Sequence, residues 1–195
     1  MHTVTNKELP MKPLHAKARK IKTWQKSLFA IGVILISPLA QAHDNSLSTG
    51  LLAGLSHPLL GVDHLVALVL AGLLLGRLTS GKQSALGGLL LALGLGAAGG
   101  AMLGAQMWIE AAILLSLPIF FALQWASTQL KTATMVMGIF MLAHGWAHGV
   151  EMANMNMAFI AGFLWTSAIT MAASSLLGAA LHSRIQARTS ATRHV

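Results

Sequence analysis

Charged residues are scarce in this 195-residue chain, and cysteine is absent. Asp, Glu, Lys and Arg together make up 9% of the residues, whereas hydrophobic residues make up 55%. Soluble domains carry roughly a quarter charged residues, so this composition excludes an ordinary soluble domain and favours a membrane protein. The lack of cysteine excludes a disulfide framework and a thiolate metal site. Any metal bound here must use nitrogen, oxygen or thioether ligands.

Acidic residues are scarcer than basic ones, and the formal net charge is +8. Most of this excess comes from the N-terminal segment, where Lys7, Lys12, Lys17, Arg19, Lys20, Lys22 and Lys26 are found. The remaining basic residues stand in short connections between apolar runs and in the C-terminal tail. This distribution is typical of membrane topology control, not of phosphate binding, so we expect no nucleic-acid partner.

The segment GRLTSGKQ, from Gly76 to Gln83, imitates a phosphate-binding loop. However, Gln83 stands where that motif requires Ser or Thr, and the segment joins two apolar runs instead of a strand and a helix. We therefore expect no nucleotide site.

The N-terminus has the organisation of a secretory leader. A basic region precedes the apolar segment SLFAIGVILISPLA, and the small-residue sequence AQA follows. These features predict a signal peptide over residues 1–42, cleaved after Ala42 to leave His43 as the new N-terminus. The alternative is a retained helix from about Trp24 to Ala42.

Five apolar segments follow the leader, and each has the ~17–25 residues that a helix needs to cross a bilayer. Because backbone groups in lipid must be satisfied internally, helices are expected. The sequence therefore predicts an all-α, polytopic membrane helix bundle forming a single domain over residues 43–195. The expected spans are about 51–75, 86–104, 107–125, 134–150 and 157–181, followed by a short tail, 182–195.

Basic residues predict the orientation of this bundle. Arg77, Lys82 and Lys131 stand in alternate connections, and Arg184, Arg188 and Arg193 follow the last span. The other connections contain no Lys or Arg. The positive-inside rule then places the mature N-terminus in the periplasm and the C-terminus in the cytoplasm, in a bacterial inner membrane.

The first span contains the motif HPLLGVDH, from His57 to His64. Spacing of seven residues predicts that His57 and His64 share one helix face. Pro58 removes a helical hydrogen bond, which at membrane depth indicates a cavity or protein-buried backbone. Asp63 is placed to act as a ligand or to orient a histidine.

The fourth span ends in HGWAHGVE, which places His144, His148 and Glu151 on one helix face. Two histidines four residues apart on a helix commonly present imidazoles to one cation. Gly145 replaces the glutamate that the zinc-protease motif requires, so that activity is not expected. Glu110 at the start of the third span and the terminal His43 are weaker candidate ligands.

Depth along the helices predicts two levels of donors facing a common path. His57, His148, Glu151 and Glu110 form the expected outer level, and Asp63, His64 and His144 form the expected inner level near the midplane. Intramembrane ionisable residues usually mark functional sites or ion paths. A transition-metal cation site is the favoured interpretation, and a proton relay or interhelical hydrogen bonding are the alternatives.

These two motifs resemble those of the HupE/UreJ family of membrane proteins. The family pattern H-P-x-x-G-x-D-H is matched from His57 to His64, and H-G-x-x-H-G-x-E is matched from His144 to Glu151. The chain departs from many relatives at Trp146 and Met171, where those relatives tend to carry histidine. The resemblance implies a non-enzymatic transporter of nickel, or cobalt, that supplies hydrogenase or urease, with no resident cofactor and the cation as substrate.

Two alternatives are compatible with the same residues. The segment MANMNM, from Met152 to Met157, suggests copper, because thioethers favour Cu(I). An integral-membrane metalloenzyme, such as a zinc hydrolase or an iron hydroxylase, could use the same histidines to activate water or oxygen. The oligomeric state is not predicted by the sequence.

Overall fold

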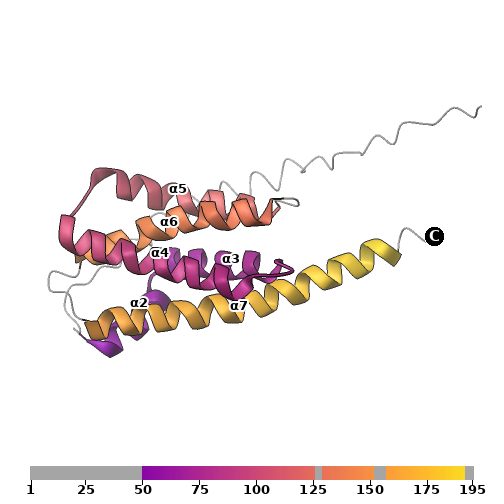
Figure 1. Cartoon of the computed structure of the whole chain (residues 1–195), viewed down its shortest axis with the longest axis horizontal. Coiled ribbons are helices and arrows are strands. Elements are labelled where there is room, and N and C mark those ends of the chain that lie inside the picture. Colours follow the sequence, from indigo (N-terminus) through magenta and orange to yellow (C-terminus); the bar gives the residue numbers. More distant parts are fainter. Residues whose placement is uncertain (1–49, 126–128, 152–156, 192–195) are drawn as a thin grey trace, which may run out of the picture.

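The computed structural model describes residues 50–125, 129–151 and 157–191, and the regular elements within these ranges are helices. They are α2 (Leu51–Leu60), α3 (Val62–Gly76), α4 (Lys82–Leu103), α5 (Met107–Leu123), α6 (Leu130–Glu151) and α7 (Met157–Ala191). Helices α3 to α7 run roughly along one axis, and α7 extends past the others at one end (Figure 1). The predicted all-α bundle is confirmed over this part of the chain. The predicted leader and His43 lie outside the described residues.

Two helices, or three if the bent pair is counted as one span, have the length and composition to cross a membrane. Helices α4 and α7 are each long and apolar enough to cross a membrane, and α2 and α3 qualify together as one bent pair. Large apolar side chains face outward, including Leu95 (58% exposed), Met135 (70%) and Leu176 (75%). Such a surface suits contact with lipid, where no free energy is lost by leaving these side chains outside the protein core.

The first predicted span is broken. Helices α2 and α3 are bent by 80° at Gly61, whose backbone is extended (φ −81°, ψ 109°). Pro58, inside α2, lacks the N–H that would bond to Gly54 and so weakens the helix just before the break. The prediction that His57 and His64 share a helix face is therefore wrong, because they lie on different helices.

Helices α4 and α6 meet along a glycine seam, formed by Gly96 and Gly100 of α4 and Gly145 and Gly149 of α6. A Cβ atom at any of the four would collide with a carbonyl oxygen of the facing helix, at Leu142, Trp146, Leu93 and Ala97 respectively. Small residues of this kind let helix backbones approach closely in lipid. The seam brings α6 against α4.

Helix α7 supports the bent pair. Gly54 of α2 and Gly72 of α3 leave no room for a Cβ, because the backbones of Phe159 and Met171 lie against them. In addition, the Thr166 hydroxyl donates a hydrogen bond to the Leu55 carbonyl oxygen, at 2.9 Å. Both arms of the bend are therefore held on one long helix.

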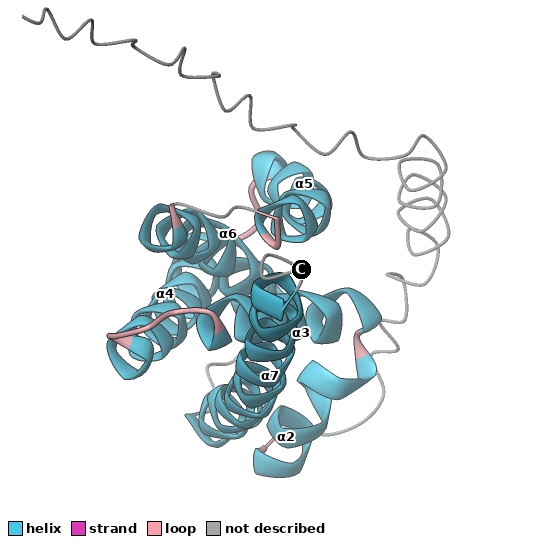
Figure 2. Cartoon of the chain, turned by 90° about the vertical axis from the view of Figure 1, so that its right-hand side faces the viewer, coloured by secondary structure: helices cyan, strands magenta, loops and turns pink. Residues whose placement is uncertain are grey.

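The opposite end of α3 is joined to α5 by the α3–α5 latch, formed by Arg77 and Gln124. The Arg77 guanidinium donates to the carbonyl oxygens of Leu123 and Gln124, at the C-terminal end of α5. The Gln124 amide donates back to the Leu70 carbonyl oxygen, at 2.9 Å. Viewed along the bundle, α3 lies near the centre and α5 at the periphery (Figure 2), so the latch ties an outlying helix to a central one.

Candidate metal centre

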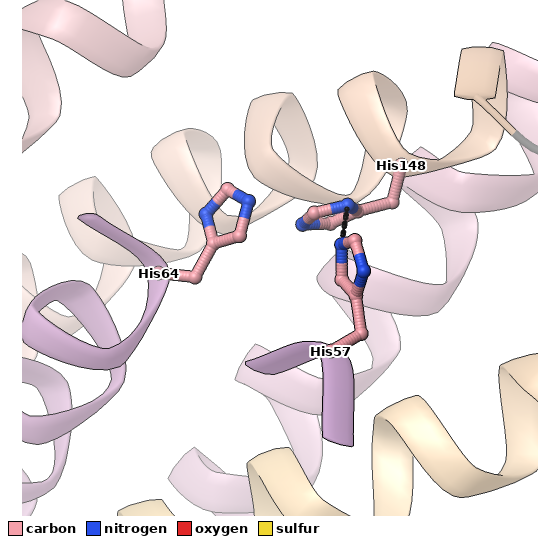
Figure 3. Close-up of side chains that lie close together, drawn as sticks. All are labelled: His57, His64 and His148. Atoms are coloured by element: carbon pink, nitrogen blue, oxygen red, sulfur yellow. Dashed lines mark hydrogen bonds between the residues drawn. The ribbon is translucent and has the colours of Figure 1, made fainter. Parts of the chain in front are cut away.

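Three histidines from three helices converge where α2 meets α3. His57 of α2, His64 of α3 and His148 of α6 each offer one ring nitrogen, and these nitrogens lie within 4.8 Å of one another. The rings point toward one another in Figure 3. His64 and His148 are buried and His57 is partly buried. We call this set the histidine trio.

The rings of the trio are in direct contact. The His57 Nε2 and His148 Nδ1 atoms lie 2.9 Å apart, a hydrogen-bond distance. Ring centroids of His64 and His148 are 4.1 Å apart, and those of His57 and His64 are 6.0 Å apart. Metal–imidazole bonds of ~2.1 Å place two donors on one ion at most ~4.2 Å apart. The His57–His148 pair already meets this limit, and a small closure of the rings brings in the third.

Asp63 and Gly61 determine how His64 is held. The Asp63 Oδ2 atom lies 3.3 Å from His64 Nδ1, a charge contact that does not reach hydrogen-bond geometry, so the orienting role of this carboxylate stays a prediction. A Cβ at Gly61 would lie 2.9 Å from His64 Cδ2 and 3.3 Å from Asp63 Oδ1. A side chain at position 61 would therefore have to displace the His64 ring, which folds back over the bend.

The glycine seam explains the direction of the α6 histidines. In the motif HGWAHGVE, each seam glycine follows a histidine, so when Gly145 and Gly149 face α4, His144 and His148 point about 100° away from it. They therefore face the interior between α6, α3 and α7. Both side chains are buried, with exposed fractions of 3% and 2%.

His144 lies next to the trio without belonging to it. Its ring centroid is 5.6 Å from that of His64. Its Nδ1 lies 3.0 Å from the Phe140 carbonyl oxygen, and its Nε2 is buried without a hydrogen-bond partner among the described residues.

The predicted division into an outer and an inner level needs correction. His64 was assigned to the inner level with His144, but its ring lies against His148 of the outer level. The cause is the bend at Gly61, which turns the start of α3 toward the end of α6 instead of continuing straight along α2.

The remaining candidate ligands are not part of the trio. Glu110 is exposed in the first turn of α5. Glu151 is the last residue of α6, and its side chain lies outside the described residues, as does His43. The copper-suggesting segment from Met152 to Met157 is also outside them, except for Met157 at the start of α7.

Two phenylalanines beside the trio were not predicted from the sequence. The Phe163 ring lies 4.8 Å from that of His148, and the Phe159 ring lies 5.5 Å from that of His57. Both belong to α7 and surround the nitrogens with apolar surface, which strengthens electrostatic interactions within the site. Their spacing of four residues at the start of the last span was the available signal.

Trp146 does not replace a member of the trio. Its indole N–H donates to the Gly104 carbonyl oxygen at 2.9 Å, and its ring packs 5.8 Å from that of Trp108. This residue therefore faces α4 and α5, on another side of α6. The absence of histidine at position 146 leaves the trio complete.

The nitrogens of the trio can bind a metal ion only where they present a free lone pair. In the contact between His57 Nε2 and His148 Nδ1, one nitrogen donates a proton and the other accepts it. A cation that uses both nitrogens needs a lone pair on each, so the donating ring must first carry its proton on its other nitrogen, as the second neutral tautomer. The two neutral rings can therefore bind one cation after a change of tautomer, without losing a proton.

Apolar helices around a buried cluster of nitrogen donors define a helical membrane protein with a candidate transition-metal site. Comparison with known proteins specifies it further. The family described as HupE / UreJ protein matches residues 31–195, and the chain belongs to this family. It is 33% identical over 159 residues to Protein HupE from Rhizobium leguminosarum bv. viciae, which covers 75% of this chain and 79% of that protein. No solved structure matches the chain.

Proposed function

We propose that this protein is an uptake transporter for a divalent transition-metal ion, Ni²⁺ first and Co²⁺ second, that supplies a hydrogenase or a urease. The histidine trio carries this proposal, because it gathers three nitrogen donors from three helices inside an apolar bundle. Burying such groups is costly in a membrane protein and is usually compensated by function. Membership of the HupE/UreJ family supports the same assignment.

The proposed orientation follows from the end of the bundle that carries the basic residues. The end of α3 and the starts of α4 and α6 hold Arg77, Lys82 and Lys131. We assign this end to the cytoplasm of a bacterial inner membrane, by the positive-inside rule. The trio then lies toward the periplasm, where a cation would enter. The proposal includes cleavage after Ala42, a periplasmic mature N-terminus, five spans over residues 43–195 and a cytoplasmic tail.

In this mechanism the trio replaces water molecules around the entering ion. Imidazole suits Ni²⁺, Co²⁺, Cu²⁺ and Zn²⁺, and Asp63 adds negative charge beside His64. The bend at Gly61 positions His57 and His64 on either side of the same space. Their approach to His148 closes the coordination sphere from three directions.

An integral-membrane metalloenzyme is the second candidate, and it is less favoured. Catalytic zinc needs an open coordination position and a general base beside it. Among the described side chains, Asp63 is the carboxylate at the trio, and its Oδ2 atom lies 3.3 Å from His64 Nδ1. Family membership also favours transport over catalysis.

The test is uptake of radiolabelled Ni²⁺, Co²⁺ and Zn²⁺ by cells that lack other high-affinity importers. Wild type should accumulate Ni²⁺ above the background of cells without the protein. His64→Ala, Asp63→Ala and His148→Ala should each reduce the initial rate strongly, because each removes a donor or the group that orients one.

A matched control is His182→Ala. His182 is a partly exposed histidine of α7, bonded to Gln186 and remote from the trio in sequence. This variant should retain wild-type uptake. Wild-type nickel accumulation by all three trio-region variants would contradict the site, and hydrolysis or oxidation of lipid by the pure protein without uptake would favour the enzyme.

A further inference from the structure

A small pocket continues inward from the trio, toward the Leu130 end of α6. Its volume is about 10 Å³, close to the room that one water-sized species needs. Residues of α3, α4, α6 and α7 line it, among them His64, Met141, His144, His148, Phe163 and Ser167. The pocket therefore shares two histidines with the trio and adds other donors.

His144 is prepared to act as a ligand in this pocket. A carbonyl oxygen only accepts hydrogen bonds, so the His144 Nδ1 atom at 3.0 Å from the Phe140 oxygen carries the proton. In the neutral ring, Nε2 then carries a free lone pair. This Nε2 is buried and has no hydrogen-bond partner in the described part of the chain. A backbone acceptor that fixes the tautomer is typical of metal-binding histidines.

Met141 and Ser167 supply the other donors. Met141 precedes His144 by three residues, so both lie on one face of α6, and its side chain is 1% exposed. Its thioether sulfur is the single donor atom of the side chain. The Ser167 hydroxyl is fully buried and donates to the Phe163 carbonyl oxygen at 2.7 Å, which leaves its own lone pairs available.

We propose that this pocket is a second binding position for the transported ion, held by His144 Nε2 and the Met141 thioether. His64 is common to both positions, because its ring lies 4.1 Å from His148 and 5.6 Å from His144. An ion would exchange His57 and His148 for His144 and Met141 while His64 stays bound. This inference rests on the proposed function.

The donor set also gives this position a chemical preference. Imidazole with thioether suits borderline and soft transition-metal ions, whereas Mg²⁺ and Ca²⁺ require oxygen ligands. The pocket would accept Ni²⁺ or Co²⁺ and reject the abundant hard cations. It thus adds a step of selection beyond the trio.

The test is X-ray absorption at the nickel K-edge, on the full chain loaded with one equivalent of Ni²⁺ in lipid nanodiscs. His57→Ala removes one outer ligand, so the ion should move to the second position. The spectrum of this variant should contain a sulfur neighbour in addition to imidazole. Adding Met141→Leu should abolish the sulfur contribution.

Met137→Leu is the matched control. Met137 lies on the same face of α6 and is fully buried, but it does not line the pocket. Exchange of Met for Leu conserves volume, so both variants should fold. In the His57→Ala background, Met137→Leu should retain the sulfur contribution.

Three results would overturn the second position: no nickel bound by His57→Ala, no sulfur neighbour in that variant, or a sulfur neighbour that survives Met141→Leu. If wild type takes up and binds nickel in the same preparations, these results leave the proposed function standing. If wild type itself neither binds nor transports nickel, both proposals fail.

Discussion

His57 and His148 are 91 residues apart in the sequence, yet the Nε2 of the first lies 2.9 Å from the Nδ1 of the second. The contact joins the short arm of a bent helix to the end of α6. One of these two nitrogens donates a hydrogen bond to the other. Both can bind one cation only after the donating ring moves its proton to its other nitrogen.

Nickel binding should weaken as the medium is acidified. Unperturbed histidine has a pKa of about 6.5. Below that pH the imidazolium form has no free lone pair, so affinity should be fully present at higher pH and decline as pH falls through this region. Titration calorimetry from pH ~8 down to ~5.5 should show a nickel affinity that falls and a proton release to the buffer that grows, because more rings must lose a proton before they bind. An affinity that is constant across the range would contradict imidazole ligation.

Gly61→Ala should disturb the trio more than the fold. The added methyl group would lie 2.9 Å from His64 Cδ2 and must displace that ring. We expect nickel affinity to fall by about 10-fold or more, in line with changes that disturb the orientation of a ligand. Isothermal titration of nickel into the purified variant and the purified wild type measures this affinity.

Gly87→Ala is the control for this change, because a Cβ there meets no atom within 4 Å. It should retain affinity and slightly favour helix α4, since alanine has the higher helix propensity. Equal nickel affinity in Gly61→Ala and wild type would show that the His64 ring does not need its observed position.

Gly149→Ala should destabilise the bundle. Its methyl group would collide with the Ala97 carbonyl oxygen, so α6 must move away from α4. Overpacking of this kind typically costs about 1–3 kcal/mol. Thermal unfolding in detergent, followed by circular dichroism, should show a lower midpoint.

Gly138→Ala is the matched control on the same helix. Its nearest neighbour would be Leu89 Cδ2 at 3.8 Å, an ordinary contact. Its unfolding midpoint should equal or exceed that of wild type. If Gly149→Ala unfolds at the same temperature as Gly138→Ala, the glycine seam is not a tight contact.

Gln124→Glu should loosen α5 from α3. The carboxylate cannot donate to the Leu70 carbonyl oxygen, which the amide does at 2.9 Å, and it repels that oxygen instead. Losing a hydrogen bond of this kind typically costs about 0.5–1.5 kcal/mol. Hydrogen exchange measured by mass spectrometry should become faster in α5 than in α4.

Gln106→Glu provides the comparison. The Gln106 amide donates a solvent-exposed hydrogen bond of 3.4 Å to the carbonyl oxygen of Leu103, only three residues earlier in the chain. Exchange in α5 should stay close to wild type. Unchanged α5 exchange in Gln124→Glu would show that the latch does not hold this helix.

Much of the helical architecture could be predicted from hydropathy alone. The predicted segment 107–125 compares with Met107–Leu123 in the structure, and 86–104 compares with Lys82–Leu103. Helix α7 runs to Ala191, beyond the predicted segment ending at residue 181. Hydropathy detects only the apolar part of a helix, which lipid can surround. The polar residues 184–188 extend α7 beyond that part, because backbone hydrogen bonds hold a helix whatever its side chains.

The grouping of the histidines could be predicted only in part. The spacing of His144 and His148 within one helix was sufficient to place both on one face. The spacing of His57 and His64 was not sufficient to place them relative to each other. Pro58 indicated a weakened helix but did not show that the chain turns three residues later, at Gly61. Contacts across helices, such as that of Phe163 with His148, depend on rotations about each helix axis that no single segment encodes.

The alternation of histidine and glycine along α6 has one more consequence. Turning this rod about its own axis by a single residue position, about 100°, would swing its small residues off the neighbouring backbone at the same time as it swung the imidazoles out of the interior. The direction of the histidine ligands and the fit of α6 against α4 thus depend on the same rotation of α6. A change in one changes the other, so the close contact that holds the bundle together also sets the direction of the donor atoms.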